Sequence, residues 1–197
     1  MSIARNLAGA FDLLMNRANG LQRMDLSADG FFMSFKGLVL AAFIDLVVLM
    51  LAHSANYLGP SGETTNSLVY ALLSVLAAFA AYGVSMLAVF LMCRTEDTQK
   101  RFPICVIAYN WAAPLFSAFA VIPFFLLIIL AGQNGNMSAL AQLVFLITIF
   151  ALAFFGIRVM KLSLDLETMP ATAIFLASAG VSWMVDRWLS GLFGLHG

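Results

Sequence analysis

The stretch that decides the fold is FFMSFKGLVLAAFIDLVVLMLA, residues 31–52. Its only charged residues are Lys36, near its start, and Asp45, well inside it. A helix needs about 20 consecutive and mostly apolar residues to cross a lipid bilayer. This stretch therefore predicts a transmembrane helix.

Four further stretches have the same character. The chain is 62% hydrophobic and only 10% charged, whereas soluble domains carry about 25% charged residues. We therefore predict an all-α, polytopic membrane helix bundle with five transmembrane helices and an N-terminal amphipathic surface helix. The predicted spans are 31–52, 67–92, 103–130, 137–159 and 171–193.

The basic residues predict the orientation of the bundle. Nine of the ten Lys and Arg residues fall on one side of a five-span chain, and the positive-inside rule makes that side cytoplasmic. The N-terminus is then expected inside and the C-terminus outside. The fifth span is the least hydrophobic, and a four-span alternative without it would place the C-terminus inside.

Residues 1–30 are expected to form a cytoplasmic amphipathic segment, ahead of a transmembrane domain at 31–197. Apolar residues recur at helical spacing over 2–19, which predicts a helix on the membrane surface or against the bundle. They are Ile3, Leu7, Phe11, Leu14 and Met15. Gly20 is expected to end this helix, and Ser27 and Asp29 stand where a cap of the first span belongs.

Asp45 is the strongest candidate for a functional residue. A carboxylate within hydrocarbon is costly, so its side chain is expected to face the bundle or water, or to be protonated. A proton or cation site is one interpretation, and a hydrogen-bonded packing residue or one drawn to the outer interface is the other. The sequence leaves both open.

Asp186 and Arg187 lie in the outer third of the fifth span. Arg187 is the basic residue that departs from the charge pattern, and two arrangements are open for it. It could pair with Asp45. The favoured alternative is that Asp186 and Arg187 reach the outer interface beside Trp183 and Trp188, which form an aromatic anchor.

Prolines and small residues mark two of the other spans. Pro114 and Pro123 free the carbonyls of Asn110 and Phe119, four residues earlier, so the helix is expected to kink there. Such a kink either lines a pathway or is a simple bend among packed helices. In the second span Ala77, Ala81 and Gly83 are expected to let helices approach closely, within the protomer or between protomers.

Signatures of catalysis are missing from the sequence. It has no HExxH, GxSxG, P-loop or GxGxxG motif, so we expect no enzyme activity, no metal and no cofactor. Cys93 and Cys105 are the only cysteines and are interpreted as small apolar fillers. The zero formal net charge gives no reason to expect nucleic acid as a partner.

Two segments carry a resemblance to a known family. They are RFPICVIAYNWAAPLFSAF, residues 101–119, and GIRVMKLSLDLETMPATAIFLASAGV, residues 156–181. The first has a charged connection leading to an aromatic residue and a proline, at Tyr109 and Pro114. The chain resembles the Yip family of five-span membrane proteins, in particular its bacterial branch. The Asp-Leu-Tyr-Gly-Pro stretch of the eukaryotic members is absent, so a partnership with Rab-type GTPases is not implied.

These observations favour a non-enzymatic membrane protein. The Ala-rich second span, the surface helix and the missing catalytic groups favour a membrane-organising scaffold or an accessory subunit of a membrane complex, in a bacterial inner (plasma) membrane. The resemblance likewise implies a non-enzymatic protein that organises or shapes membrane. Its expected partners are the lipid bilayer and a protein partner or a second copy of the chain. The alternative is a small transporter or channel component that uses Asp45.

Overall fold

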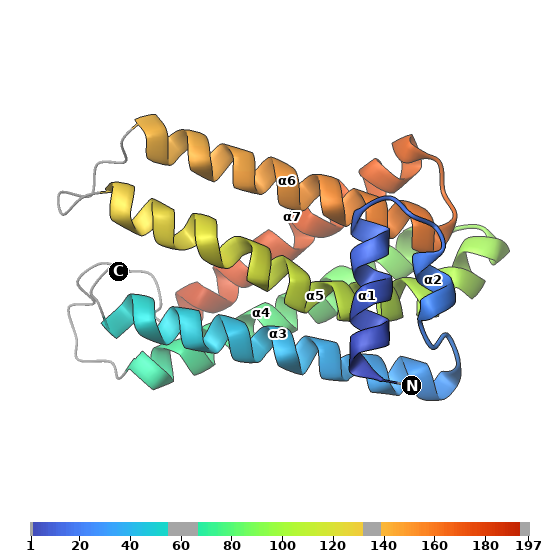
Figure 1. Ribbon diagram of the computed structural model, residues 1–197, viewed down its shortest axis with the longest axis horizontal. Coiled ribbons are helices and arrows are strands. Elements are labelled where there is room, and N and C mark those ends of the chain that lie inside the picture. The colour runs from blue at the N-terminus through green and yellow to red at the C-terminus, as the bar shows by residue number, and fades with distance from the viewer. Residues whose placement is uncertain (1, 55–66, 132–138, 194–197) are drawn as a thin grey trace.

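A computed structural model describes residues 2–54, 67–131 and 139–193. These residues form seven helices and no strand, which confirms the predicted fold class. Two short helices come first and five long ones follow (Figure 1). The helices are α1 Ile3–Leu14, α2 Gly20–Arg23, α3 Ala28–Ser54, α4 Ser67–Met92, α5 Glu96–Ala131, α6 Ala139–Leu164 and α7 Thr168–Leu192.

The five long helices run up and down beside one another and form a closed circuit. α3 packs against α4 and α5, α5 packs against α6, and α7 packs against both α4 and α6. One end of the bundle holds the starts of α3, α5 and α7 (Figure 1). We call it the basic end, because it carries Arg5, Arg17, Arg23, Lys36, Arg94, Lys100, Arg101, Arg158 and Lys161.

Within the described residues, five helices are long and apolar enough to cross a membrane, and they are α3 to α7. Their outer faces expose large apolar side chains that a water-soluble protein would bury. Ile122 and Phe150 are each 70% exposed, and Trp188 is 66% exposed. Since lipid tails are apolar, such faces suit contact with a bilayer, and the chain is a membrane protein.

The third span begins earlier than the sequence predicts. The predicted span starts at residue 103, but α5 already starts at Glu96. The Thr95 side chain accepts a hydrogen bond from the Thr98 backbone N–H at 3.2 Å, which caps the helix. Glu96 and Asp97 in the first turn suit the positive end of the helix dipole. The charged residues therefore extend the helix beyond its apolar part.

The N-terminal helix is shorter than predicted. α1 ends at Leu14, and Asn16 then adopts a left-handed backbone with φ 60°. Gly20 begins α2 instead of ending α1. A Cβ atom on Gly20 would lie 2.5 Å from the Gly9 carbonyl oxygen, so glycine lets the two short helices touch. Ser27 caps α3 as predicted, since its Oγ accepts a hydrogen bond from the Gly30 N–H at 3.1 Å.

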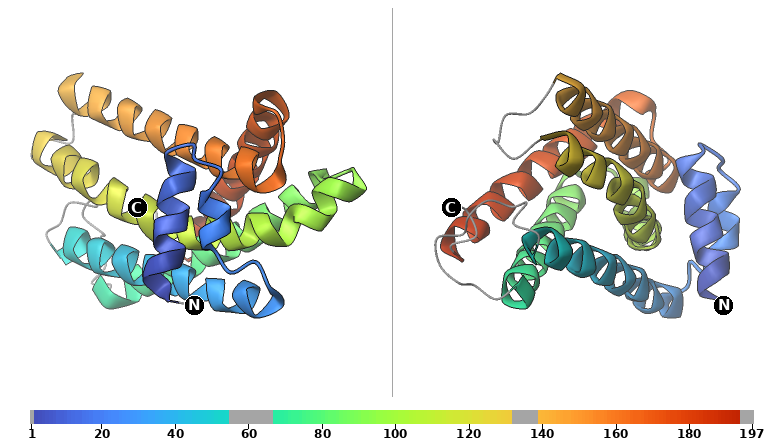
Figure 2. Two further views of the ribbon diagram at one scale, coloured as in Figure 1. Left: turned by 45° about the vertical axis from the view of Figure 1, so that its right-hand side comes forward. Right: turned by 60° about the vertical axis from the view of Figure 1, so that its left-hand side comes forward.

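α1 crosses the long helices at a steep angle near the basic end (Figures 1 and 2). It packs against α5 and α6. Leu13 and Leu14 are fully buried against the bundle, whereas Ile3 and Phe11 are exposed. α1 therefore lies against the bundle with one apolar face and leaves a second apolar edge uncovered.

Arg158 of α6 holds the end of α1. Its Nη1 donates a hydrogen bond to the Leu14 carbonyl oxygen at 2.8 Å. Its guanidinium carbon also lies 3.9 Å from the centre of the Phe154 ring. A cation at the last carbonyls of a helix satisfies an orphan acceptor and suits the helix dipole. Arg158 therefore joins the N-terminal helix to the membrane-spanning part of the protein.

The close contact between α3 and α5 depends on a glycine. A Cβ atom on Gly37 would lie 2.2 Å from the backbone oxygen of Asn110. Pro114 has no N–H, so this oxygen lacks the usual helical partner four residues later. Gly37 thus lets α3 lie directly on the carbonyl that Pro114 leaves free.

We predict that Gly37→Ala destabilises the bundle by about 1–3 kcal/mol, because α3 and α5 must move apart to relieve the overlap. Thermal unfolding in mild detergent measures the change. Gly83→Ala is the matched control, since a Cβ atom there meets nothing within 4 Å. The control should unfold at the wild-type temperature or above it. Equal melting temperatures for Gly37→Ala and the wild type would contradict the prediction.

A second prediction concerns the attachment of α1. Arg158→Met removes the hydrogen bond to Leu14, so trypsin should cleave after Arg17 and Arg23 several-fold faster than in the wild type. Lys161→Met on the same helix is the control, because the Lys161 amine bonds the Thr168 side chain instead. Identical cleavage rates in the two variants would mean that Arg158 does not hold α1.

Candidate functional site

A buried polar network joins three of the long helices. The Tyr82 hydroxyl of α4 donates a hydrogen bond to Asn110 Oδ1 at 2.5 Å. Asn110 Nδ2 donates to Ser34 Oγ of α3 at 2.7 Å, and Ser34 Oγ donates to the Phe31 carbonyl at 2.6 Å. Asn110 and Ser34 are both fully buried. In a low-dielectric interior, satisfied polar groups of this kind fix how helices pack.

A cavity of about 440 Å³ opens beyond this network, among α3, α4 and α5. Tyr82 belongs to both, because it bonds Asn110 and also lines the cavity. The lining is mainly apolar, and the residues in it that carry a polar group are Asp45, Ser74, Ser117 and Tyr82. The cavity therefore lies on the side of the network that faces away from the basic end.

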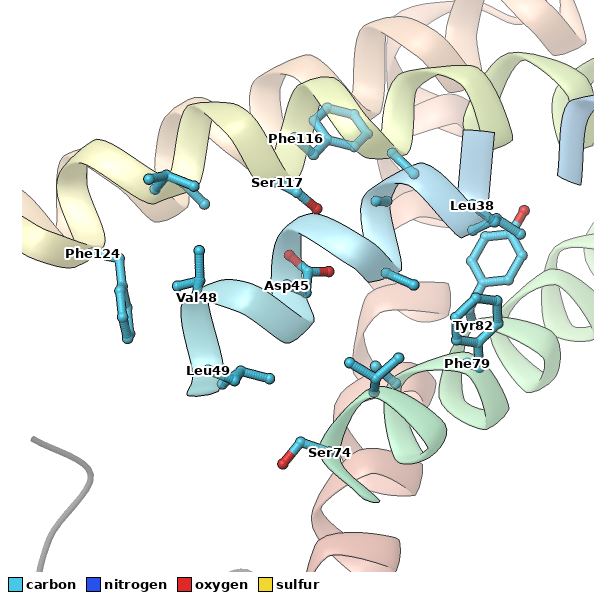
Figure 3. Close-up of a pocket in the computed structure, with 17 residues that line it drawn as sticks. Leu38, Asp45, Val48, Leu49, Ser74, Phe79, Tyr82, Phe116, Ser117 and Phe124 are labelled. Atoms are coloured by element: carbon cyan, nitrogen blue, oxygen red, sulfur yellow. The ribbon is translucent and has the colours of Figure 1, made fainter. Parts of the chain in front are cut away.

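Asp45 projects into this cavity (Figure 3). Its side chain is exposed and lines the cavity. The Ser117 hydroxyl of α5 points toward it (Figure 3). Asp45 was expected to face the bundle or water, or to be protonated, and its side chain faces this cavity among α3, α4 and α5. One hydroxyl leaves most of the acceptor capacity of a carboxylate unused.

Asp45 and Arg187 do not form an ion pair. The cavity around Asp45 is built by α3, α4 and α5, whereas Asp186 and Arg187 lie on α7, where the Arg187 side chain is exposed. Trp183 and Trp188 on the same helix are 65% and 66% exposed. The side chains of Arg187, Trp183 and Trp188 are therefore all exposed on α7.

The residues expected to pack helices fall into two groups. Ala77 and Ala81 of α4 are buried, at 0% and 1% exposed. Gly83 faces open space and mediates no close contact within the protomer.

Pro114 and Pro123 both lie inside α5. Pro114 falls between Ala113 and Phe116, which line the cavity.

The sequence did not reveal Ser34, Tyr82 or Ser117 as members of a site. Tyr82 and Ser34 are common residues of membrane helices, and their partners lie on other spans. A signal did exist for Ser117, which follows Asn110 by two helical turns and so shares its face of α5. Because residues seven positions apart lie on the same helix face, the position of Asn110 pointed to Ser117 as a second polar residue on that face.

The cysteines fit the interpretation as apolar fillers. Cys93 and Cys105 are buried in one hydrophobic cluster with Met86, Val89 and Met160. Burial raises the pKa of the Cys93 thiol above its ordinary value, which suppresses the reactive thiolate. Within residues 2–54, 67–131 and 139–193, no three His, Cys, Asp or Glu side chains are grouped so that they could hold a metal ion.

Comparison with protein-family models, with curated proteins and with solved structures gave no match to this chain.

The network generates a prediction about stability. Tyr82→Phe leaves Asn110 Oδ1 without its buried donor, which should cost about 1–3 kcal/mol. Asn110→Leu removes both interhelical bonds and should cost more. Because both variants break one shared bond, the double variant should lose less than the sum of the two single losses. Chemical unfolding in detergent micelles measures the cycle, and strictly additive losses would contradict the network.

Proposed function

We propose that this membrane protein is a small transporter or channel component whose working site is the cavity at Asp45. The observation that carries the proposal is the position of the carboxyl group, which faces an accessible cavity within the bundle. An acid at this depth has to hold a proton or meet a cation, since a bare carboxylate in apolar surroundings is costly. A residue that only packed helices would have its oxygens enclosed by partners.

The proposal includes an orientation. We place the basic end in the cytoplasm, because positively charged connections stay inside. The N-terminus is then inside, the C-terminus is outside, and the cavity lies toward the outer leaflet. The inner membrane of a bacterium and membership of the Yip family remain predictions from the sequence.

Flux across liposome membranes tests the function. The full chain is reconstituted with a trapped pH-sensitive dye, and a pH gradient is imposed while valinomycin and K⁺ clamp the potential. We expect the wild type to dissipate the gradient faster than empty liposomes do, and Asp45→Asn to fall to their rate. Asp186→Asn is the matched control, since it removes a carboxylate on α7, and should keep the wild-type rate.

Equal rates of gradient dissipation in the wild type and the variant would overturn the proposal. If the wild type and Asp45→Asn dissipate the gradient at the same rate, Asp45 is not the working group. A thermal unfolding measurement on each variant before reconstitution shows that a lost rate does not come from a lost fold.

A membrane-organising or accessory role is the second candidate, and the position of α1 favours it. α1 lies across the bundle with Ile3 and Phe11 exposed, at 50% and 43%. If the long helices cross the membrane, this helix lies along its surface and its free apolar edge can enter the headgroup region. Such a helix could organise lipid or a protein partner, including a second copy.

The size and shape of reconstituted vesicles distinguish this membrane-organising role from the transporter role. At a fixed protein-to-lipid ratio, a membrane-organising protein should give smaller or tubular vesicles in electron micrographs. Phe11→Gln should weaken that effect without changing flux. Vesicles of the same size with the wild type and with Phe11→Gln would count against the role.

A further inference from the structure

We propose that the Asp45 cavity binds an amphipathic organic monocation, namely an ammonium compound whose apolar body lies among aromatic side chains. The inference rests on the proposed function only in taking this cavity as the working site, and it adds the chemical class of the ligand. Charge, ring placement and cavity size each support it separately.

When Asp45 is ionised, the lining carries one negative charge and no compensating positive charge. Asp45 is the one ionisable acid in its lining, and no Lys, Arg or His contributes to it within the described part of the chain. The Ser117 hydroxyl points toward Asp45 (Figure 3), and a hydroxyl brings no positive charge. A ligand that carries one positive charge would supply the missing counter-charge.

Aromatic rings face the same space. Phe79 and Tyr82 come from α4, and Phe116 and Phe124 come from α5. Phe116 and Phe124 lie on one side of Asp45, and Phe79 and Tyr82 lie on the other (Figure 3). Because the Tyr82 hydroxyl bonds Asn110, what Tyr82 offers the cavity is its ring. Faces of aromatic rings attract cations, and quaternary ammonium groups are bound in this way.

The size and the ligand set disfavour a bare metal ion. The cavity volume of about 440 Å³ falls within the range of about 300–1000 Å³ typical of small-molecule sites. Hard cations such as Ca²⁺ take about six to eight oxygen ligands. The side-chain oxygens here come from Asp45, Ser74, Ser117 and Tyr82, and the Ser74 hydroxyl already donates to the Tyr70 carbonyl at 2.9 Å. An organic cation with an apolar body fits this lining better.

Two probes of nearly equal shape test the inference. Benzyltrimethylammonium carries the charge, and in neopentylbenzene a carbon atom replaces the nitrogen. Their binding to the full chain in an uncharged detergent is measured by calorimetry near pH 8, with protein-free micelles as the blank. We expect the ammonium compound to bind at least about tenfold more tightly, because only it gains the ion pair and the ring contacts.

Substitutions in the cavity then show which residues produce the preference for the ammonium compound over its neutral analogue. Asp45→Asn should bring the two probes to within about twofold of each other, since a tenfold ratio is about 1.4 kcal/mol and most of it would come from the carboxylate. Phe116→Leu should weaken the ammonium compound more than its neutral analogue. Asp186→Asn should leave the wild-type ratio unchanged.

Each remaining outcome counts against the inference. Equal affinity of the two probes for the wild type would overturn it, as would a preference that survives Asp45→Asn. Absence of binding by either probe up to millimolar concentration would overturn it as well. The first comparison uses the wild type alone, so it does not depend on how a variant folds.

Binding and flux can fail separately. If the ammonium compound binds at Asp45 while gradient dissipation does not depend on Asp45, the ligand class holds and transport fails. If flux depends on Asp45 but the ammonium compound has no advantage, transport holds and the ligand is a proton or another cation.

Discussion

The arrangement of the bundle depends on one buried amide. Asn110 is fully enclosed, and its side chain takes a hydrogen bond from Tyr82 and gives one to Ser34. Its backbone oxygen, which Pro114 leaves without a helical donor, is covered by α3 at Gly37. In an apolar environment no water can replace a lost partner, so α3, α4 and α5 are held in one register by this residue.

The network also divides the bundle into two unlike halves. Toward the basic end, Ile107, Trp111 and Val159 pack with the buried face of α1 in one hydrophobic cluster. On the other side of the network, small residues such as Ala41, Ala78 and Ala113 line the cavity. Asp45 belongs to this open half. The same contacts that fix the helices at Asn110 therefore leave Asp45 accessible beyond it.

The N-terminal helix completes the closed half. Leu13 and Leu14 of α1 pack with Ile107 and Trp111 of α5, and Arg158 bonds the end of the helix. Asp12 is 4% exposed and lies 3.4 Å from Arg17 and 3.2 Å from Arg23, which keeps its charge compensated. α1 is thus part of the core, and a change there would be felt where α5 meets α6.

Apolar length and periodicity determined most of the fold. Five stretches with too few charges for a soluble protein had to become long helices, and α4 has the predicted bounds of 67–92. The start of α5 was misplaced because a charged segment can be helical when it has a cap such as Thr95. The end of α1 was misplaced because Asn16, rather than a glycine, takes the left-handed position.

The sequence by itself determined that this is an all-helical membrane protein, and it identified Asp45 as a residue with an unusual position. Only the tertiary structure decided what surrounds that residue. Ser117 lies on α5 and Tyr82 on α4, and Arg187, which the sequence also offered, lies on α7 away from the cavity. The physical reason is that a hydropathy pattern specifies which segments leave water. It does not specify which faces of those segments meet, since that depends on close contacts such as Gly37 on Asn110.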